Sequence, residues 1–219
     1  MITFEQVKKN EAIAEYIRSA DRSLIALGYT EHSFAHVGKV VYATEYILRS
    51  LGFDEDQIEL AKIAAYMHDI GNLVNRVDHS QSGAIMAFRI LDNRGMEPEN
   101  IATIVTAIGN PDEGTGVPVS DIAAALILAD KSDVRRSRVR NRDEATFDIH
   151  DRVNYSVTSA DISINEARDE IVLSLDIDTK YSSVMDYFEI FMKRMILCRK
   201  AAEKLGMRFR LKINGQILL

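Results

Sequence analysis

Two neighbouring side chains, His68 and Asp69, are of types that suit chemistry better than packing. They stand at the end of an apolar run and directly before Ile70-Gly71. We predict a helix that ends at Ile70 with Gly71 as its C-terminal stop, which sets the two side chains about 100° apart around the axis. An imidazole and a carboxylate that lean toward one point suit a divalent metal. Because adjacent His and Asp also recur by chance, the interpretation depends on residues elsewhere.

The other ionisable groups that can join this pair stand well apart from it in the chain. They are His36 on the N-terminal side, and His79 and Asp130 on the C-terminal side. Each lies next to or within a segment with helical periodicity. Helices that pack in one bundle can bring such side chains together. The elements around them therefore decide whether a site forms.

Six helical segments are predicted over residues 4–130, on the basis of apolar periodicity and caps such as Asp54 with Gln57. They run from Phe4 to Leu27, from about Glu31 to Leu51, from Asp54 to the His68-Asp69 pair, from Ser80 or Gln81 to Leu91, from Pro98 to Ile108, and from Ser120 past Ala129. Asp130 is expected at or just past the middle of the last helix. Residues 109–116 are rich in helix breakers and are predicted as a loop.

The pattern changes from helical to alternating at about residue 153. The predicted elements are strands over 156–164 and 171–177, joined by a hairpin loop at 165–169, a helix over 183–205, and a strand over 208–213. Together they favour a small sheet with a helix across one face. We expect this part to be structural or dimer-forming and to carry no ligand.

Composition limits the classes of function. The formal net charge of -6 argues against general binding to nucleic acid or to anionic membranes. The single cysteine, Cys198, excludes an intramolecular disulfide and a thiolate zinc cluster, and no apolar run approaches the length of a membrane span. The N-terminus does not resemble a signal peptide. We therefore expect a reduced, cytoplasmic protein.

Three segments in this order resemble the HD superfamily of metal-dependent phosphohydrolases. They are residues 32–40, with His36 followed four residues later by Val40, residues 67–71, which contain the His68-Asp69 pair, and residues 128–133, which contain Asp130. The family pattern sets a valine four residues after the first ligand, which selects His36 over His32. The resemblance covers roughly residues 30–135, about half of the chain.

The resemblance implies that His36, His68, Asp69 and Asp130 ligate one metal. Two imidazoles and two carboxylates leave open positions on an octahedral ion for water and a phosphate oxygen. The implied cofactor is a divalent ion such as manganese, iron, cobalt, nickel, zinc or magnesium, and mixed His/Asp ligation disfavours calcium. Asp69 would also accept a proton from water, and Lys131, beside Asp130, would offset charge on the phosphoryl oxygens.

His79 bears on whether a second metal binds. Family members with two metals carry further histidines after the pair, and residues 79–84 resemble the segment with the first of them. The next is expected around residues 108–113, where this chain has Asn110. We therefore expect one tight metal, with His79 binding phosphate or a weak second ion.

A run of arginines follows Asp130 at positions 135, 136, 138, 140 and 142. If the sixth helix continues, Arg135, Arg138 and Arg142 share one face and reach the metal site, where Arg135 and Arg138 would clamp phosphate oxygens. The alternative is a solvated helix end paired with Asp133, Asp143 and Glu144. The sequence leaves both open.

Other residues of reactive types have simpler explanations. His32 is expected near the rim of the site, with its nitrogens satisfied by backbone or water. His150-Asp151 repeats the dipeptide without the apolar helix before it or the glycine after it, so chance explains it better. Cys198 lies on the helix face that covers the sheet and is expected in the core.

The resulting prediction is a mainly α fold, with an HD-type helical bundle over residues 1–152 and a small C-terminal α+β appendage over residues 153–219. The predicted function is metal-dependent hydrolysis of a phosphate ester, of a nucleotide or another small phosphorylated molecule. The alternative is a catalytically weak or inactive HD-type module that binds metal or nucleotide and acts in regulation. The sequence allows a homodimer.

Overall fold

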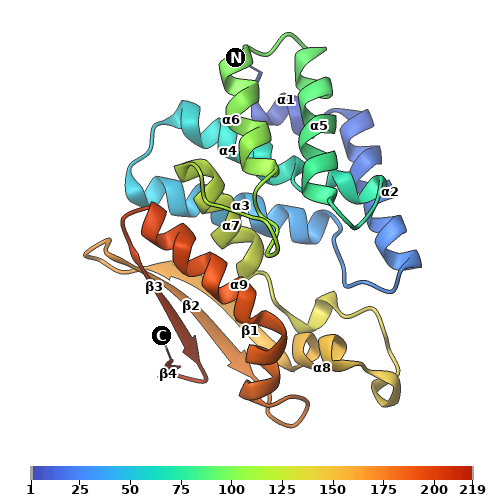
Figure 1. Cartoon of the computed structure of the whole chain (residues 1–219), viewed down its shortest axis with the longest axis vertical. Helices are drawn as coiled ribbons and strands as arrows, with labels where there is room; N and C mark the ends of the chain where they lie inside the picture. Colours follow the sequence, from blue (N-terminus) through green and yellow to red (C-terminus); the bar gives the residue numbers. More distant parts are fainter. Residues whose placement is uncertain (1, 219) are drawn as a thin grey trace.

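The computed structural model describes residues 2–218 of the chain. Within that range the helices are α1 (Phe4–Lys8), α2 (Glu11–Ala26), α3 (Phe34–Leu51), α4 (Glu55–Met67), α5 (His79–Asp92), α6 (Pro98–Ile108), α7 (Asp121–Ser132), α8 (Ile149–Ser156) and α9 (Val184–Lys204). The strands are β1 (Val157–Ile164), β2 (Glu170–Ile177), β3 (Arg208–Ile213) and β4 (Gln216–Ile217), and three short 3-10 turns join helices. Figure 1 shows a helical bundle with a small sheet at one end, which confirms the predicted mainly α fold.

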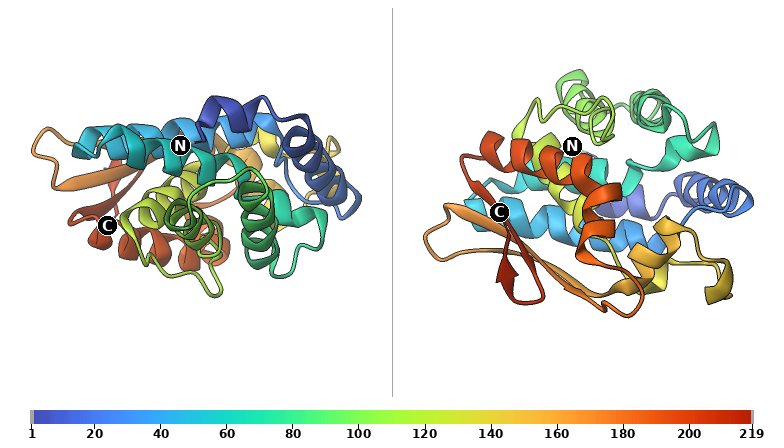
Figure 2. Two further views of the ribbon diagram at one scale, coloured as in Figure 1. Left: turned by 90° about the horizontal axis from the view of Figure 1, so that it is seen from above. Right: turned by 60° about the horizontal axis from the view of Figure 1, so that its bottom comes forward.

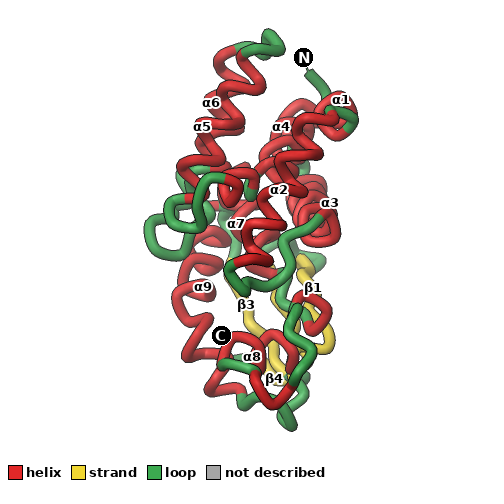
Figure 3. The backbone as a smooth tube through the Cα atoms, turned by 90° about the vertical axis from the view of Figure 1, so that its right-hand side faces the viewer, coloured by secondary structure: helices red, strands yellow, loops and turns green. Residues whose placement is uncertain are grey.

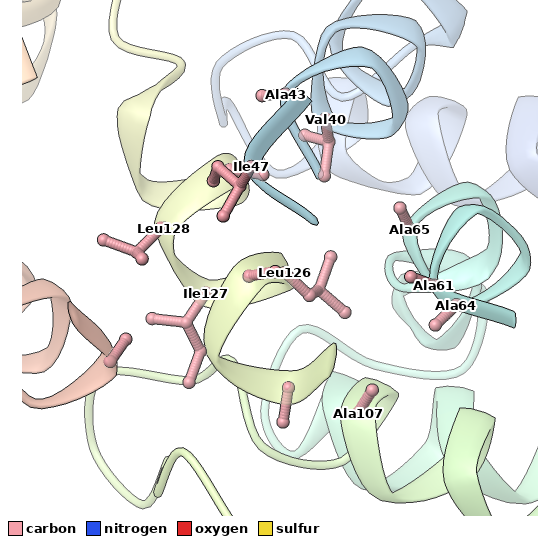
Figure 4. Packing of buried hydrophobic residues seen from close by; sticks show 14 of the residues in the cluster. Val40, Ala43, Ile47, Ala61, Ala64, Ala65, Ala107, Leu126, Ile127 and Leu128 are labelled. Atoms are coloured by element: carbon pink, nitrogen blue, oxygen red, sulfur yellow. The ribbon is translucent and has the colours of Figure 1, made fainter. Parts of the chain in front are cut away.

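Helix α7 lies at the centre of the bundle. It packs against α3, α4, α6 and α9, and every residue of its run from Ile122 to Ala129 is buried. Alanines at positions 123, 124, 125 and 129, and small residues on the neighbouring helices, let the helices approach closely. Figure 4 shows Leu126, Ile127 and Leu128 among residues of α3, α4 and α6. Because α7 has neighbours on several sides, its residues are apolar around the whole helix.

The predicted first helix, from Phe4 to Leu27, is wrong because the chain breaks it in two. The side chain of Asn10 accepts hydrogen bonds from the backbone N–H groups of Ala12 and Ile13, and so caps α2 as a new helix. The second predicted helix also starts later than expected, at Phe34, where Ser33 is the cap. The fifth and sixth helices begin as predicted, at Pro98 and after Ser120.

The segment after the His68-Asp69 pair also differs from the prediction. Helix α4 ends at Met67, and Ile70–Leu73 forms a 3-10 turn, so Gly71 is not a helix stop. A side chain at Gly71 would overlap the backbone oxygen of His79 and the backbone nitrogen of Gly83. Gly71 therefore lets this turn pack directly against the start of α5, which brings His79 next to the pair.

The sheet has the order β1-β2-β3-β4, with β2 and β3 parallel and the other pairs antiparallel. Helix α9 connects the two parallel strands and packs against both the sheet and α7 (Figure 2). The strands lie at the end of the molecule opposite the tips of α5 and α6 (Figure 3). The hairpin, helix and third strand are confirmed, whereas α8 and β4 were not predicted.

One hydrophobic cluster runs through the bundle and the C-terminal part. It includes Leu126 and Val134 as well as Leu173, Phe191 and Leu211. The division of the chain at residues 152 and 153 stays a prediction.

Among residues 2–218, none of the helices is long and apolar enough to cross a membrane.

Candidate metal centre

Three helices bring the predicted ligands to one point. His36 stands in the first turn of α3, His68 and Asp69 follow the last residue of α4, and Asp130 lies in the last turn of α7 rather than near its middle. The Nε2 atoms of His36 and His68 lie 3.4 and 3.7 Å from Asp130 Oδ1, and 3.6 and 3.3 Å from Asp69 Oδ2. The four side chains therefore converge although 94 residues of chain, from 36 to 130, separate the outer two.

The atoms that converge lack other partners. His36 Nε2, His68 Nε2 and Asp69 Oδ2 are buried and have no hydrogen-bond partner within residues 2–218. Leaving a buried polar atom unpaired costs about 1–3 kcal/mol, so three at one point call for a ligand. His36, His68 and Asp130 each offer one ligand atom close enough to the others to share one ion. The donor set therefore fits a divalent metal.

Hydrogen bonds on the far side of each ring fix which nitrogen faces the centre. His36 Nδ1 lies 2.8 Å from Asp133 Oδ2, and His68 Nδ1 lies 2.8 Å from the backbone oxygen of Ala65. Each Nδ1 donates to its oxygen, which leaves the Nε2 lone pair free for a metal. Asp133 was considered from the sequence only as a partner for arginines. Its role at His36 depends on a contact across 97 residues, which no local pattern predicts.

The charges around the centre are set by the carboxylates. Burial acts to lower the pKa of His68, but Asp69 and Asp130 outweigh burial and raise that pKa to about 9. Burial acts to raise the pKa of Asp69, but His68 holds it well below its usual range, and Lys131 does the same for the buried Asp130. Both carboxylates are therefore ionised and can act as ligands over the physiological pH range.

Asp69 and Asp130 form part of the wall of a pocket of about 490 Å³. The basic residues in this wall are His32, Arg76, His79, Lys131, Arg138, His150 and Arg194. The same wall also carries five carboxylates, those of Asp69, Glu113, Asp130, Asp148 and Asp151, so acidic and basic side chains nearly balance. A divalent ion at the centre would add two positive charges, and the pocket would then favour an anionic ligand beside it.

His79 and Lys131 lie beside the proposed ligands. His79 Nε2 is 3.7 Å from Asp69 Oδ1, and its Nδ1 is 3.1 Å from the backbone oxygen of Arg76. Burial lowers the pKa of His79, so its ring is neutral near pH 7. Lys131 Nζ is 2.8 Å from Asp130 Oδ2. Burial acts to lower the pKa of Lys131, but Asp130 raises it, so the side chain stays cationic.

The arginine run is arranged differently from both predictions. Helix α7 ends at Ser132 and Arg136–Arg138 is a 3-10 turn, so the predicted shared helix face is wrong. Arg138 lies in the pocket wall and is buried, with Nε donating to the backbone oxygen of Glu31. Arg135 does not line the pocket and instead pairs with Glu31 and Asp133. It is only 16% exposed, so the solvated helix end is wrong, although the predicted pairing of the run with Asp133 is present.

Several pocket residues were missed from the sequence. Arg76 and Glu113 come from loops between helices, and Arg194 comes from α9 in the C-terminal part, which was expected to contribute nothing to a ligand site. His150 and Asp151 of α8, explained by chance above, also reach the wall. Their positions depend on how α8 and α9 pack on the bundle, and no local motif indicates it.

The fold and the converging side chains describe a mainly helical protein with a His/Asp cluster that could hold a divalent ion. A family model of the HD domain matches residues 33–152, more than half of the chain. The chain therefore belongs to the HD domain family, a superfamily of metal-dependent hydrolases, and the resemblance stated from its sequence is confirmed.

Two individual proteins are identical to this chain at about a quarter of their aligned residues. The uncharacterized protein MJ1020 of Methanocaldococcus jannaschii is 24% identical over 211 residues, which cover 85% of this chain and 79% of that protein. A crystal structure of a predicted HD superfamily hydrolase from an uncultured Thermotogales bacterium is 25% identical. That match covers 57% of this chain and 67% of the other, with a TM-score of 0.46. The family assignment rests on the match over residues 33–152.

Proposed function

We propose that this chain is a metal-dependent phosphohydrolase that cleaves a phosphate ester of a small molecule, with nucleotides as the first substrates to test. The observation that supports this most is the convergence of unpaired atoms from His36, His68 and Asp69 beside a pocket whose wall includes Lys131 and Arg138. Unpaired buried ligand atoms favour a metal, and the charge of a bound ion together with Lys131 and Arg138 favours an anionic substrate beside it.

His36, His68, Asp69 and Asp130 would hold the ion. When bound, a divalent metal supplies a Lewis acid for a phosphoryl oxygen and lowers the pKa of water. One tight ion is the proposal, because Asn110 stands where a further histidine is expected and its Nδ2 donates to the backbone oxygen of Thr106.

Asp69 is the proposed proton acceptor. Its Oδ1 accepts a hydrogen bond from Asn72 Nδ2 at 3.0 Å, while its Oδ2 faces the centre without a partner among the described residues. The Asn72 contact fixes the carboxylate, so Oδ2 can take a proton from water that approaches the centre. His79, neutral and near Asp69 Oδ1, would hold a phosphate oxygen or a weak second ion.

Lys131 and Arg138 would bind the phosphate. Both lie in the pocket wall, Arg138 is buried and the Lys131 side chain is only 12% exposed, so their charges act in surroundings with little water. Arg135 is proposed as a positioning residue instead, because its Nε donates to Asp133 Oδ1 and so helps to hold the carboxylate behind His36.

Two measurements test this function. Elemental analysis of the purified protein should find a bound divalent ion, and a panel of nucleotides and a generic aryl phosphate with added manganese should release phosphate. The Asp69→Asn variant should lose that activity. A protein that retains its ion but releases no phosphate from any of these would contradict the hydrolase and favour the regulatory metal-binding module.

A further inference from the structure

A second group of charges lies in the same pocket and joins three distant parts of the chain. Glu113 is in the loop between α6 and α7, Lys131 is at the end of α7, and Arg194 is in the middle of α9. Glu113 Oε1 lies 2.8 Å from Arg194 Nε and 3.4 Å from Lys131 Nζ. One carboxylate oxygen therefore contacts two cations that come from different elements.

The two cations are more deeply placed than the carboxylate between them. The side chains of Lys131 and Arg194 are 12% and 19% exposed, whereas that of Glu113 is 32% exposed. Burial acts to raise the pKa of Glu113, but Arg194 and Lys131 outweigh it and lower that pKa, so the carboxylate is ionised. The buried pair thus holds an anion, and here that anion belongs to the protein itself.

The guanidinium of Arg194 is held in a fixed orientation, but only one of its N–H groups donates a hydrogen bond to the described residues. Its central carbon lies 4.1 Å from the centroid of the Phe191 ring, an attractive cation–π contact one turn away on α9. Its Nε donates to Glu113, and its two Nη groups have no hydrogen-bond partner within residues 2–218. Arg194 lines the pocket, so a guanidinium with two uncommitted Nη groups lies in its wall.

Lys131 connects this group to the metal centre. Its Nζ is 2.8 Å from Asp130 Oδ2, while Oδ1 of the same carboxylate faces His36 and His68. A ligand held by Lys131 and Arg194 would therefore lie next to one held at the centre. Adjacent positions of this kind suit two neighbouring anionic groups of a single molecule.

We propose that Lys131 and Arg194 form a second anion subsite, which Glu113 fills in the free protein and which takes the second anionic group of the substrate. The substrate class follows: a small phosphate ester with a neighbouring anionic group, such as a nucleoside diphosphate, rather than a simple monophosphate. The assignment of this substrate class rests on the proposed function, whereas the anion subsite does not depend on it.

A purely structural ion pair would behave differently. If Glu113 only ties α9 to α7 and to the loop, replacing either end of the pair loosens the same contact. If Glu113 fills an anion site, removing its charge removes a competitor for an incoming anion, whereas removing Arg194 removes a donor. The two substitutions then change anion affinity in opposite directions, whereas loosening one shared contact would change it in the same direction in both variants.

The experiment is a calorimetric titration of the metal-free, chelator-treated full chain with pyrophosphate. We expect Glu113→Gln to bind at least threefold more tightly than the wild type and Arg194→Gln to bind about tenfold more weakly, as for the loss of one charge-assisted hydrogen bond. Arg199→Gln is the matched control on the same helix, since Arg199 is 57% exposed, and it should stay within twofold.

The subsite is overturned if Arg194→Gln binds within threefold of Arg199→Gln, or if Glu113→Gln binds no more tightly than the wild type. Thermal unfolding of each variant checks that it folds. If Arg194→Gln does not fold, Arg194→Lys takes its place under the same threshold, because an ammonium keeps the charge but loses the planar fork.

A second arm tests the substrate class on the metal-loaded protein. The Michaelis constant for a nucleoside diphosphate should be at least tenfold below that for the monophosphate of the same base, and Arg194→Gln should reduce that ratio to under threefold. A wild type that prefers the monophosphate overturns the substrate class. Failure to hold metal or to hydrolyse either compound counts against the proposed function, while the metal-free titration still decides the subsite.

Discussion

His68-Asp69 and His150-Asp151 are the same dipeptide in two settings. The first follows the buried helix α4, and His68 is 1% and Asp69 7% exposed. The second lies in the first turn of α8, where His150 is exposed and Asp151 accepts a hydrogen bond from Asn141. Both dipeptides reach the same pocket, yet only the first has unpaired buried atoms that converge with ligands from other helices.

The difference shows why only the first pair is proposed to bind a metal. An exposed imidazole or carboxylate is satisfied by water or a neighbour, so it has no need of an ion. His68 Nε2 and Asp69 Oδ2 are enclosed by α3 and α7 and cannot be satisfied that way. The enclosing helices, rather than the dipeptide, therefore create the demand for a metal.

The largest expected effect is on metal affinity, and it tests the difference between the two dipeptides directly. His68→Ala removes a ligand and should lower metal affinity by more than the roughly 100-fold seen for the loss of an outer hydrogen-bond partner. His150→Ala, the matched change in the other pair, should leave metal affinity within about twofold. Metal titration of both variants measures this, with circular dichroism as the folding control. Equal losses in the two variants would remove the distinction between the pairs.

A smaller effect is expected one contact further out. Asp133→Asn leaves all four proposed ligands in place but replaces the carboxylate that accepts from His36 Nδ1. We expect metal affinity to fall about 10- to 100-fold, because the amide holds the imidazole less firmly in the required tautomer. Asp143→Asn, at an exposed position, is the control. An unchanged affinity in Asp133→Asn would mean that this hydrogen bond does not orient the ligand.

The arginine run provides the next comparison, between a residue in the pocket wall and one behind it. Arg138→Gln should raise the Michaelis constant for a phosphorylated substrate about tenfold, the effect of losing a charge-assisted hydrogen bond. Arg135→Gln should change it by less than about threefold, since Arg135 does not line the pocket. Steady-state kinetics with matched metal content measures both. A larger effect at Arg135 would contradict the assignment of Arg138 to the phosphate.

A separate prediction concerns the dependence of stability on pH. The metal-free folded protein keeps a proton on His68 up to a pKa of about 9, whereas the ordinary value is 6.5. The resulting stabilisation is complete below pH 6.5 and is lost as the pH rises through about 9. Since a metal needs the neutral imidazole, metal affinity should rise over the same interval.

Urea unfolding of the metal-free protein between pH 6.5 and 9 measures the free energy of unfolding as a function of pH. The control variant His150→Ala should keep the decrease with pH, and His68→Ala should lose that decrease. A wild-type stability that stays flat across this interval would show that His68 is not protonated in the metal-free centre.

Local signals predicted much of the helical part. Pro98 set the start of α6 and the Ser120 cap set the start of α7, because both act within one turn of chain. The three segments with His36, the pair and Asp130 were found because the family repeats them in order. Two predictions from local patterns failed. The apolar stripe of the first segment is continuous, but the Asn10 cap divides it into two helices. Gly71 was predicted as a helix stop, but it allows close packing against α5 instead.

The pocket wall could not be predicted in the same way. Asp133 reaches His36 across 97 residues, and Arg194 reaches Glu113 across 81. Such contacts depend on how α3, α7 and α9 pack, and helix periodicity indicates only which face is apolar, not which neighbour covers it. Arg194 was therefore not singled out from the sequence, although it lines the pocket.

The most direct test of the metal centre is the stoichiometry of tight metal binding, measured by mass spectrometry under native conditions on the wild type and on Asp130→Asn. We predict one divalent ion per wild-type chain and none retained by Asp130→Asn, because Asp130 supplies the ligand atom from α7 that faces both histidines. A wild type that retains no ion, or an Asp130→Asn variant that retains a full complement, would contradict the centre.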